Sequence, residues 1–233
     1  VIWYQAPDGT VANELFARLN VARIPLTDAE LVKALILSGS AHAGTGTNRQ
    51  EQVAAQWDSF ERDLRNPDFW AFLTGSSVSR STHIDFLFES MTRLPPGRSI
   101  RPRYWTFGEV QEQIDKSSSE SFWRRVVERH GLLTGWFQDV DLYHYVGYLT
   151  ATGDSISALL DAAAGLTHSE CGDMLSVRIR SRLNLTRGQI ETLRYGIGKD
   201  EKQMTRLLLL MNVETTRRQG ARFSFHEFAS AKL

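Results

Sequence analysis

Large hydrophobic side chains recur at helical spacing along much of the chain. One set of four falls on a single face of a helix: Val53, Trp57, Phe60 and Leu64. Asn66 and Pro67 follow this set, and proline disfavours the helical conformation in the residue before it. The pattern therefore predicts an amphipathic helix that ends near residue 66.

Two later segments show the same kind of pattern. Leu142, Val146 and Leu149 again share one helical face, and Gly153 follows as a stop signal. Residues 207–211 are apolar around most of the helical circumference. A helix that is hydrophobic on most sides is usually buried, so this segment predicts the central helix of a bundle.

Helix starts are marked by pairs of polar residues three positions apart. In such a capping box, the hydroxyl of Thr27 accepts from the backbone N–H of Glu30, and the Glu30 carboxylate accepts from the Thr27 N–H. The same pattern occurs four times: at Thr27/Glu30, Ser117/Glu120, Thr167/Glu170 and Thr186/Gln189. The sequence thus predicts a mainly α-helical bundle, with at most one or two short strands near the termini, at residues 1–4 and 222–225.

Two segments interrupt the helical pattern. Residues 38–48 are rich in Gly, Ser and Thr, and residues 94–103 contain Pro95, Pro96, Gly97 and Pro102. The second segment is the better boundary. We therefore predict an N-terminal part at 1–93, a linker at 94–103 and a helical subdomain at 104–233.

Composition places the chain among ordinary globular proteins. It has 233 residues, of which 42% are hydrophobic, which is enough for a substantial core. No segment reaches the roughly 18 apolar residues that span a bilayer, so no membrane partner is expected. Cys171 is the single cysteine and excludes an internal disulfide, which fits a cytoplasmic location.

The formal net charge is zero, but the charges are unevenly distributed. Residues 109–170 carry ten acids and four bases, whereas residues 178–222 carry eleven bases and four acids. Four arginines of the second segment lie close together in sequence: Arg178, Arg180, Arg182 and Arg187. They are candidates for binding DNA phosphates. The alternative is that they pair with the acidic segment or form a solvated helix face.

Several short motifs follow one another in a recognisable order. The first is F-x-x-x-N, formed by Phe16 and Asn20, followed by P-L-T-x-x-E-L at residues 25–31. Further motifs lie at 57–61, 69–73, 84–88, 143–148, 207–213 and 222–225. Together they resemble the GmrSD-type restriction-endonuclease subunit family of the ParB/sulfiredoxin-like superfamily. The chain lacks that family's D-G-Q-Q-R motif and its H-N-H nuclease motif.

The resemblance implies a function in bacterial anti-phage defence. It suggests that the chain is the central-to-C-terminal helical part of a modification-dependent restriction protein, with DNA and a nuclease domain or subunit as partners. A nucleoside triphosphate and Mg²⁺ are implied for the whole protein. We expect the chain alone neither to hydrolyse nucleotides nor to cut DNA.

Phe16, Arg18 and Asn20 are the predicted nucleotide- or DNA-binding residues of the N-terminal part. Phe16 and Asn20 lie four residues apart and share one face of a helix, where the amide can donate and accept hydrogen bonds and Arg18 can pair with a phosphate. The alternative is that Phe16 belongs to the core and that Asn20 ends a helix. A non-enzymatic DNA-binding or protein-interaction scaffold is the second functional hypothesis.

Other candidate sites are weak. Gly39 and Gly44 have the spacing of a phosphate-binding loop, but the lysine that should follow is absent. His168, Glu170 and Cys171 bring three possible zinc ligands together, whereas a closed zinc site needs four. Cys171 as a nucleophile would need His168 as its base, and a buried thiol is more common. The sequence therefore predicts no metal site.

Overall fold

The computed structural model describes residues 26–42, 46–98, 100–193 and 200–231. Most of these residues are helical, and no strand occurs among them. In chain order the helices are α2 (Asp28–His42), α3 (Gly46–Leu64), α4 (Pro67–Thr74), α5 (Asp85–Met91), α6 (Trp105–Asp115), α7 (Ser119–Gln138), α8 (Val140–Ala151), α9 (Ile156–Ala163), α10 (His168–Leu183), α11 (Arg187–Thr192), α12 (Glu201–Arg218) and α13 (Phe225–Ser230). The predicted mainly α-helical bundle is confirmed.

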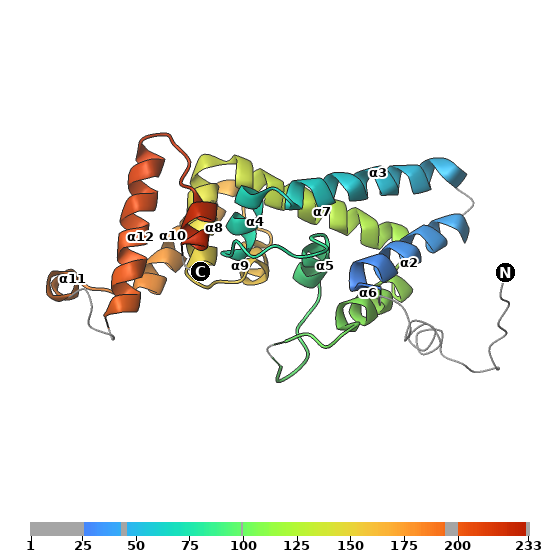
Figure 1. The fold of residues 1–233 in the computed structure, drawn as a ribbon, viewed down its shortest axis with the longest axis horizontal. Helices are drawn as coiled ribbons and strands as arrows, with labels where there is room; N and C mark the ends of the chain where they lie inside the picture. Colours follow the sequence, from blue (N-terminus) through green and yellow to red (C-terminus); the bar gives the residue numbers. More distant parts are fainter. Residues whose placement is uncertain (1–25, 43–45, 99, 194–199, 232–233) are drawn as a thin grey trace.

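The helices form an elongated body with α7 along its middle (Figure 1). Helices α2, α3, α5 and α6 gather near the start of α7, and α4, α8, α10, α12 and α13 gather near its end. On α3, the rings of Trp57 and Phe60 lie 5.9 and 5.7 Å from the ring of Trp123 on α7. One hydrophobic core includes buried residues from both groups of helices.

Helix α8 occupies the centre of the second group. It contacts α4, α7, α9, α10, α12 and α13, and nearly all of its side chains are buried. Its polar groups are satisfied inside the protein: the hydroxyl of Thr150 donates to the carbonyl of Phe72 at 2.7 Å, and that of Tyr143 donates to the carbonyl of Phe223 at 2.7 Å. The predicted face formed by Leu142, Val146 and Leu149 is part of this buried surface.

The prediction that the apolar 207–211 segment is central to the bundle is wrong. Helix α12 lies at one end of the body (Figure 1), where Leu209 and Val213 are buried but Leu208 and Met211 are 43% and 58% exposed. Successive residues of a helix point in directions about 100° apart, so five consecutive apolar residues surround the axis whatever the helix packs against. The length of an apolar run therefore did not identify the central helix.

Two glycines allow close packing around α8. A Cβ on Gly147 would lie 2.2 Å from the ring of Phe225, so α13 can approach only a glycine at this position. Gly75 ends α4 in the left-handed conformation with φ of 64°, and a Cβ there would lie 2.3 Å from the carbonyl oxygen of Thr150. Both contacts depend on the absence of a side chain.

Three of the four predicted capping boxes begin a helix where expected. The backbone N–H of Thr27 donates to the Glu30 carboxylate at 2.7 Å, and that of Thr167 donates to the Glu170 carboxylate at 2.8 Å. The backbone N–H of Thr186 donates to the side-chain oxygen of Gln189 at 2.9 Å. At the fourth predicted box, Ser118 rather than Ser117 caps the helix, since its hydroxyl accepts from Ser121 N–H at 3.0 Å. Ser117 instead donates to Gln113 at the end of α6.

The two predicted breaks differ. The predicted extent of the 38–48 break is largely wrong, because α2 continues to His42 and α3 begins at Gly46. Residues 94–98 and 100–103 do form a non-helical connection between α5 and α6. The division into 1–93 and 104–233 stays a prediction, and the described helices on both sides of 94–103 share one core. Residues 1–4 lie outside the described residues, and 222–224 precede the helix that begins at Phe225.

Candidate functional site

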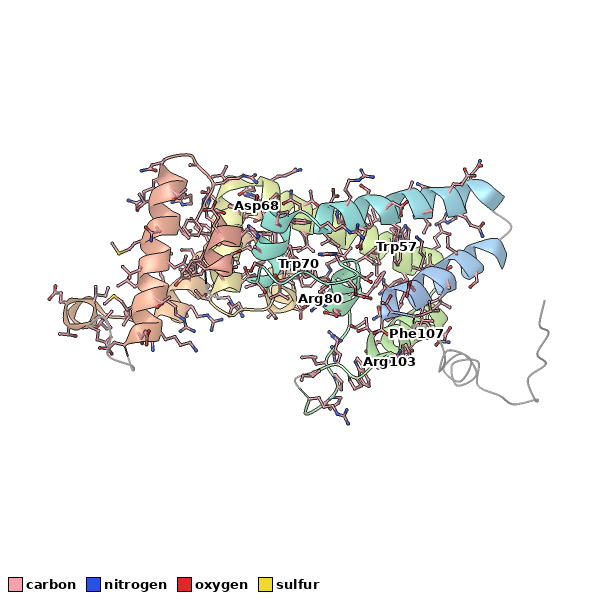
Figure 2. The ribbon with its side chains drawn as sticks, in the orientation of Figure 1. Trp57, Asp68, Trp70, Arg80, Arg103 and Phe107 are labelled. Atoms are coloured by element: carbon pink, nitrogen blue, oxygen red, sulfur yellow. The ribbon has the colours of Figure 1, made fainter. Side chains whose placement is uncertain are left out.

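A polar hollow of about 410 Å³ opens where the start of α2, the helix α5 and the segment before α6 meet. Three carboxyl groups and two guanidinium groups line it, those of Asp28, Asp85, Glu89, Arg101 and Arg103. Figure 2 shows Arg103 on the segment that leads into α6, close to Phe107 on that helix. Charged residues from three separate stretches of the sequence thus share one surface hollow.

Carboxylates on neighbouring helices cap the helix starts around this hollow. Asp28 on α2 accepts from the backbone N–H groups of Thr106 and Phe107 in the first turn of α6. Asp85 on α5 accepts from the N–H of Ala29 in the first turn of α2. Helix α6 has no side-chain cap of its own, so Asp28 satisfies N–H groups that would otherwise lack partners.

A third carboxylate extends this arrangement to α5. Glu61 on α3 accepts from the backbone N–H groups of His83 at 3.2 Å and Ile84 at 2.9 Å, just before α5 begins. Burial alone would raise the pKa of Glu61, but these N–H groups and Arg65 hold it below its ordinary value. The carboxylates of α3, α5 and α2 therefore link four helices through their ends.

Asp85 is the most perturbed carboxyl group in the hollow. Burial, together with smaller contributions from the nearby carboxylates of Asp28 and Glu89, raises its pKa from 3.8 to about 7. Its Oδ1 atom is buried and has no hydrogen-bond partner within the described residues. A carboxyl group with a pKa near 7 exchanges its proton at neutral pH, and such groups concentrate at functional sites.

The remaining charges of the hollow have identifiable partners. Arg80 donates to the carboxylate of Glu89 at 2.8 Å, and its guanidinium group also lies 5.8 Å from the ring of Trp70. Figure 2 labels Arg80 and Trp70. The guanidinium group of Arg103 lies 4.8 Å from the ring of Tyr104 and is exposed to solvent.

The F-x-x-x-N motif lies next to this hollow in sequence. Phe16, Arg18 and Asn20 themselves lie outside the described residues, so their predicted role stays a prediction. Leu26, which follows Asn20 by six residues, is the first described residue and lines the hollow.

The basic stretch at 178–222 pairs in part with the acidic segment. Arg178 Nε lies 2.6 Å from Asp154 Oδ2, and Arg182 pairs with the other oxygen of the same carboxylate. Arg217 lies 2.6 Å from Asp141. For these residues the structure supports the alternative of internal pairing, and a DNA contact stays a prediction.

The two other predicted arginines of this stretch differ. Arg180 is exposed on α10, and Arg187 begins α11, but its side chain lies outside the described residues. The structure thus brings Arg178 and Arg182 together at one carboxylate and does not group all four arginines into one site.

The His168, Glu170 and Cys171 cluster is occupied by structural contacts. Glu170 completes the cap of α10 with Thr167, and His168 Nε2 lies 3.0 Å from Asp139. Burial raises the pKa of the Cys171 thiol, which opposes its use as a nucleophile.

No metal site emerges from the described ranges. They contain no group of three or more His, Cys, Asp or Glu side chains arranged to hold a metal ion.

Sequence reasoning missed Asp28, Asp85 and Glu61 as site and capping residues. Asp85 stands in the 84–88 motif between apolar residues, and Asp28 stands inside the Thr27/Glu30 capping box. A charged residue inside an otherwise apolar motif was the available signal for Asp85. The partners of all three carboxylates are distant in sequence or belong to another helix, so their roles needed the fold.

No described helix has both the length and the apolar character needed to cross a membrane. Comparison of the chain with protein-family models, with curated proteins and with solved structures gives no significant match.

Proposed function

We propose that this chain is the helical portion of a GmrSD-type, modification-dependent restriction protein that acts in bacterial anti-phage defence. It contributes to a nucleotide- or DNA-handling site whose catalytic residues lie outside this chain. One observation carries the proposal. The segment that follows the F-x-x-x-N motif and the Asp85 of the 84–88 motif line the same polar hollow.

The chemistry of the hollow fits a ligand with phosphate groups. Guanidinium groups such as that of Arg103 form paired hydrogen bonds with phosphate oxygens. A carboxyl group with the raised pKa of Asp85 carries its proton for part of the time at neutral pH. In that form it donates a hydrogen bond to an anionic oxygen instead of repelling it. Burial raises the pKa of Asp28, and the backbone N–H groups that it binds offset this effect only in part. Arg80 pairs with Glu89.

The roles of Mg²⁺ and a nucleoside triphosphate stay with the whole protein. No step of the proposal depends on a metal held by the described residues. We expect the purified chain to show neither nucleotide hydrolysis nor DNA cleavage.

The proposal is tested by phage plating on bacteria that carry the complete gene encoding this chain. The gene should lower plating of phages whose DNA contains modified bases and leave unmodified phages unaffected. Asp85→Ala should restore plating of the modified phages, because alanine cannot donate a hydrogen bond to an anionic oxygen. Asp173→Asn on the exposed surface of α10 is the matched control and should restrict like the wild type.

Two results decide against the proposal in different ways. Equal plating of modified and unmodified phages would exclude modification-dependent restriction. Full restriction by Asp85→Ala would leave the hollow without a functional role and would favour the alternative of a non-enzymatic helical scaffold.

A further inference from the structure

The connection between α5 and α6 is strongly basic. Residues 93–103, here named the arginine loop, contain Arg93, Arg98, Arg101 and Arg103 and neither Asp, Glu nor Lys. The loop projects away from the helical body below α5 and α6 in Figure 1. It borders the hollow described above through Arg101, Pro102 and Arg103.

One of the four arginines holds the base of the loop in place. Arg101 donates to the carbonyls of Glu89, Thr92 and Arg93 at 2.7 to 2.9 Å, at the end of α5. A cation at this position also interacts favourably with the helix dipole. The indole N–H of Trp105 donates to the Arg93 carbonyl at 2.9 Å from the other side. Both ends of the loop are therefore fixed to the body.

The tip of the loop is a tight turn. The backbone N–H of Arg98 donates to the carbonyl of Pro95 at 3.1 Å, and Gly97 has φ of 70°. Proline in the second position and glycine in the third favour a type II turn, in which the third residue needs a positive φ. The turn fixes the backbone at Arg98, whose side chain is exposed.

The other three arginines are available to a partner. Arg93, Arg98 and Arg103 are exposed, and none of them forms an ion pair with another described residue. By contrast, Arg80 nearby is bound to Glu89. Three guanidinium groups on a projecting loop without acids produce a local positive field, although the whole chain is neutral.

Two apolar side chains accompany the arginines. Ile100 is 78% exposed and Leu94 is 50% exposed, both within the same loop. Proteins that bend DNA place apolar side chains of this kind against or between base steps while arginines hold the flanking phosphates. A convex loop of this length is also too small for a standard protein interface, which covers about 800 Å² on each partner.

We propose that the arginine loop binds the phosphate backbone of duplex DNA, with Arg93, Arg98 and Arg103 on phosphates and Ile100 against the groove. The choice of DNA as the partner rests on the proposed function. Guanidinium groups match phosphate oxygens in pairs, and an exposed isoleucine beside them fits a groove better than a flat acidic surface. The contact is independent of base sequence, since the three arginines are assigned to phosphates, and phosphate contacts carry no sequence information.

The test is the salt dependence of binding to a labelled duplex of mixed sequence, measured by fluorescence anisotropy with the full chain. Arg93→Gln combined with Arg98→Gln should weaken binding and make the slope of log affinity against log salt shallower by about 1.8, at about 0.9 for each phosphate contact. Between about 50 and 200 mM salt this difference in slope amounts to about a tenfold change in affinity.

The control variant combines Arg62→Gln on α3 with Arg124→Gln on α7. Both side chains are exposed, so this variant removes the same charge from other parts of the surface. It should retain the wild-type slope and affinity. Circular dichroism and thermal melting establish that both variants are folded.

Three results would overturn the inference: absence of duplex binding by the wild type at low salt, an equal loss in both variants, or competition by polyglutamate as effective as that by DNA of the same charge. Phage plating is scored separately. Loop-dependent DNA binding without restriction would contradict the proposed function but support the loop as a DNA-binding surface. Restriction without loop-dependent DNA binding would keep the proposed function and overturn the assignment of the loop as a DNA-binding surface.

Discussion

Two opposing effects act on the carboxyl group of Asp85. The backbone N–H of Ala29 favours its charged form, because a carboxylate is a stronger acceptor at a helix start than a neutral acid. Burial and the negative charges of Asp28 and Glu89 favour the protonated form and dominate, so the pKa rises to about 7. The protein keeps this carboxyl group at some cost to its stability at neutral pH.

Replacement of Asp85 by Asn should therefore stabilise the protein at alkaline pH. The folded-state pKa of Asp85 lies above the unfolded value, so its contribution to stability is complete below pH 4 and is lost as the pH rises towards 7. At pH 8 the gain is on the order of 2 kcal/mol, since each pKa unit corresponds to about 1.4 kcal/mol and partial solvent access reduces the full value.

Urea denaturation of both proteins at pH 4 and pH 8 measures this effect. The difference in the free energy of unfolding between Asp85→Asn and the wild type should increase towards pH 8. A difference that is constant between the two pH values would show that Asp85 is ionised in the folded protein throughout this range.

His144 provides a pH dependence of the opposite sign. Its ring is fully buried: Nδ1 donates to the Val140 carbonyl at 2.6 Å, and Nε2 accepts from the Phe223 N–H at 3.3 Å. The neutral ring satisfies both contacts, whereas a protonated ring cannot accept from Phe223. Burial lowers the pKa of His144, so the unfolded state binds the proton more readily.

Stability should consequently be complete above pH 6.5 and should decrease as the pH falls below this value. His144→Gln has no titratable ring and should reduce this acid-induced loss, with His226→Gln as a control outside this network. Thermal melting at pH 5.5 and pH 7.5 gives the comparison. Equal acid sensitivity of His144→Gln and the wild type would contradict the role of His144.

At the scale of elements, α8 organises one half of the molecule. Six helices pack against it, and two of these contacts depend on a glycine. The ring of Phe225 on α13 occupies the space that a side chain at position 147 would fill. The position of the last described helix therefore depends on one residue of the central helix.

Gly147→Ala should destabilise the protein by about 1–3 kcal/mol, as overpacking in a core usually does, because the Phe225 ring has to move. Gly131→Ala on α7 is the matched control, since a Cβ there meets nothing within 4 Å. That control should be neutral or stabilising by up to about 1 kcal/mol from helix propensity. Chemical denaturation measures both, and equal effects would contradict the packing of α13 on α8.

Helix starts separate what local sequence can predict from what it cannot. The caps at Thr27, Thr167 and Thr186 were predicted because both partners lie three residues apart. Helices α5 and α6 have no side-chain cap of their own and receive carboxylates from Glu61 and Asp28. Glu61 and Asp28 lie far in sequence from the helices that they cap, so no local sequence pattern predicts these contacts.

At the scale of the whole molecule, opposite charges separated in sequence meet in the fold. Asp154 follows α8, its side chain is 9% exposed, and it binds Arg178 and Arg182 on α10. The sequence showed the acidic and the basic segment but left open whether they pair. Only the packing of α10 on α8 brings these groups within contact distance.

Asp154→Asn should destabilise the protein by about 1–3 kcal/mol, because it removes the charge that binds two partly buried guanidinium groups. Asp173→Asn on the exposed side of α10 should change stability by less than about 0.5 kcal/mol. Urea denaturation of the two variants measures the difference. If Asp154→Asn left the free energy of unfolding unchanged, the ion pairs of Asp154 with Arg178 and Arg182 would not stabilise the fold.

The candidate site was predictable only in part. The order of the motifs predicts a site at Phe16 and Asn20, and Leu26, six residues after Asn20, lines the hollow. The contribution of Asp85 depends on burial and on carboxylates from other helices, which a sequence pattern does not reveal. The arginine loop was predicted only as a linker, because its prolines and glycine dominate the local pattern.

Hydrogen–deuterium exchange with and without a duplex or a nucleoside triphosphate with Mg²⁺ tests the central claim most directly. Ligand binding should slow exchange at the amides that border the hollow, at residues 26–30, 84–89 and 101–106. Slowed exchange confined to α10 and α12, with these three segments unchanged, would contradict it.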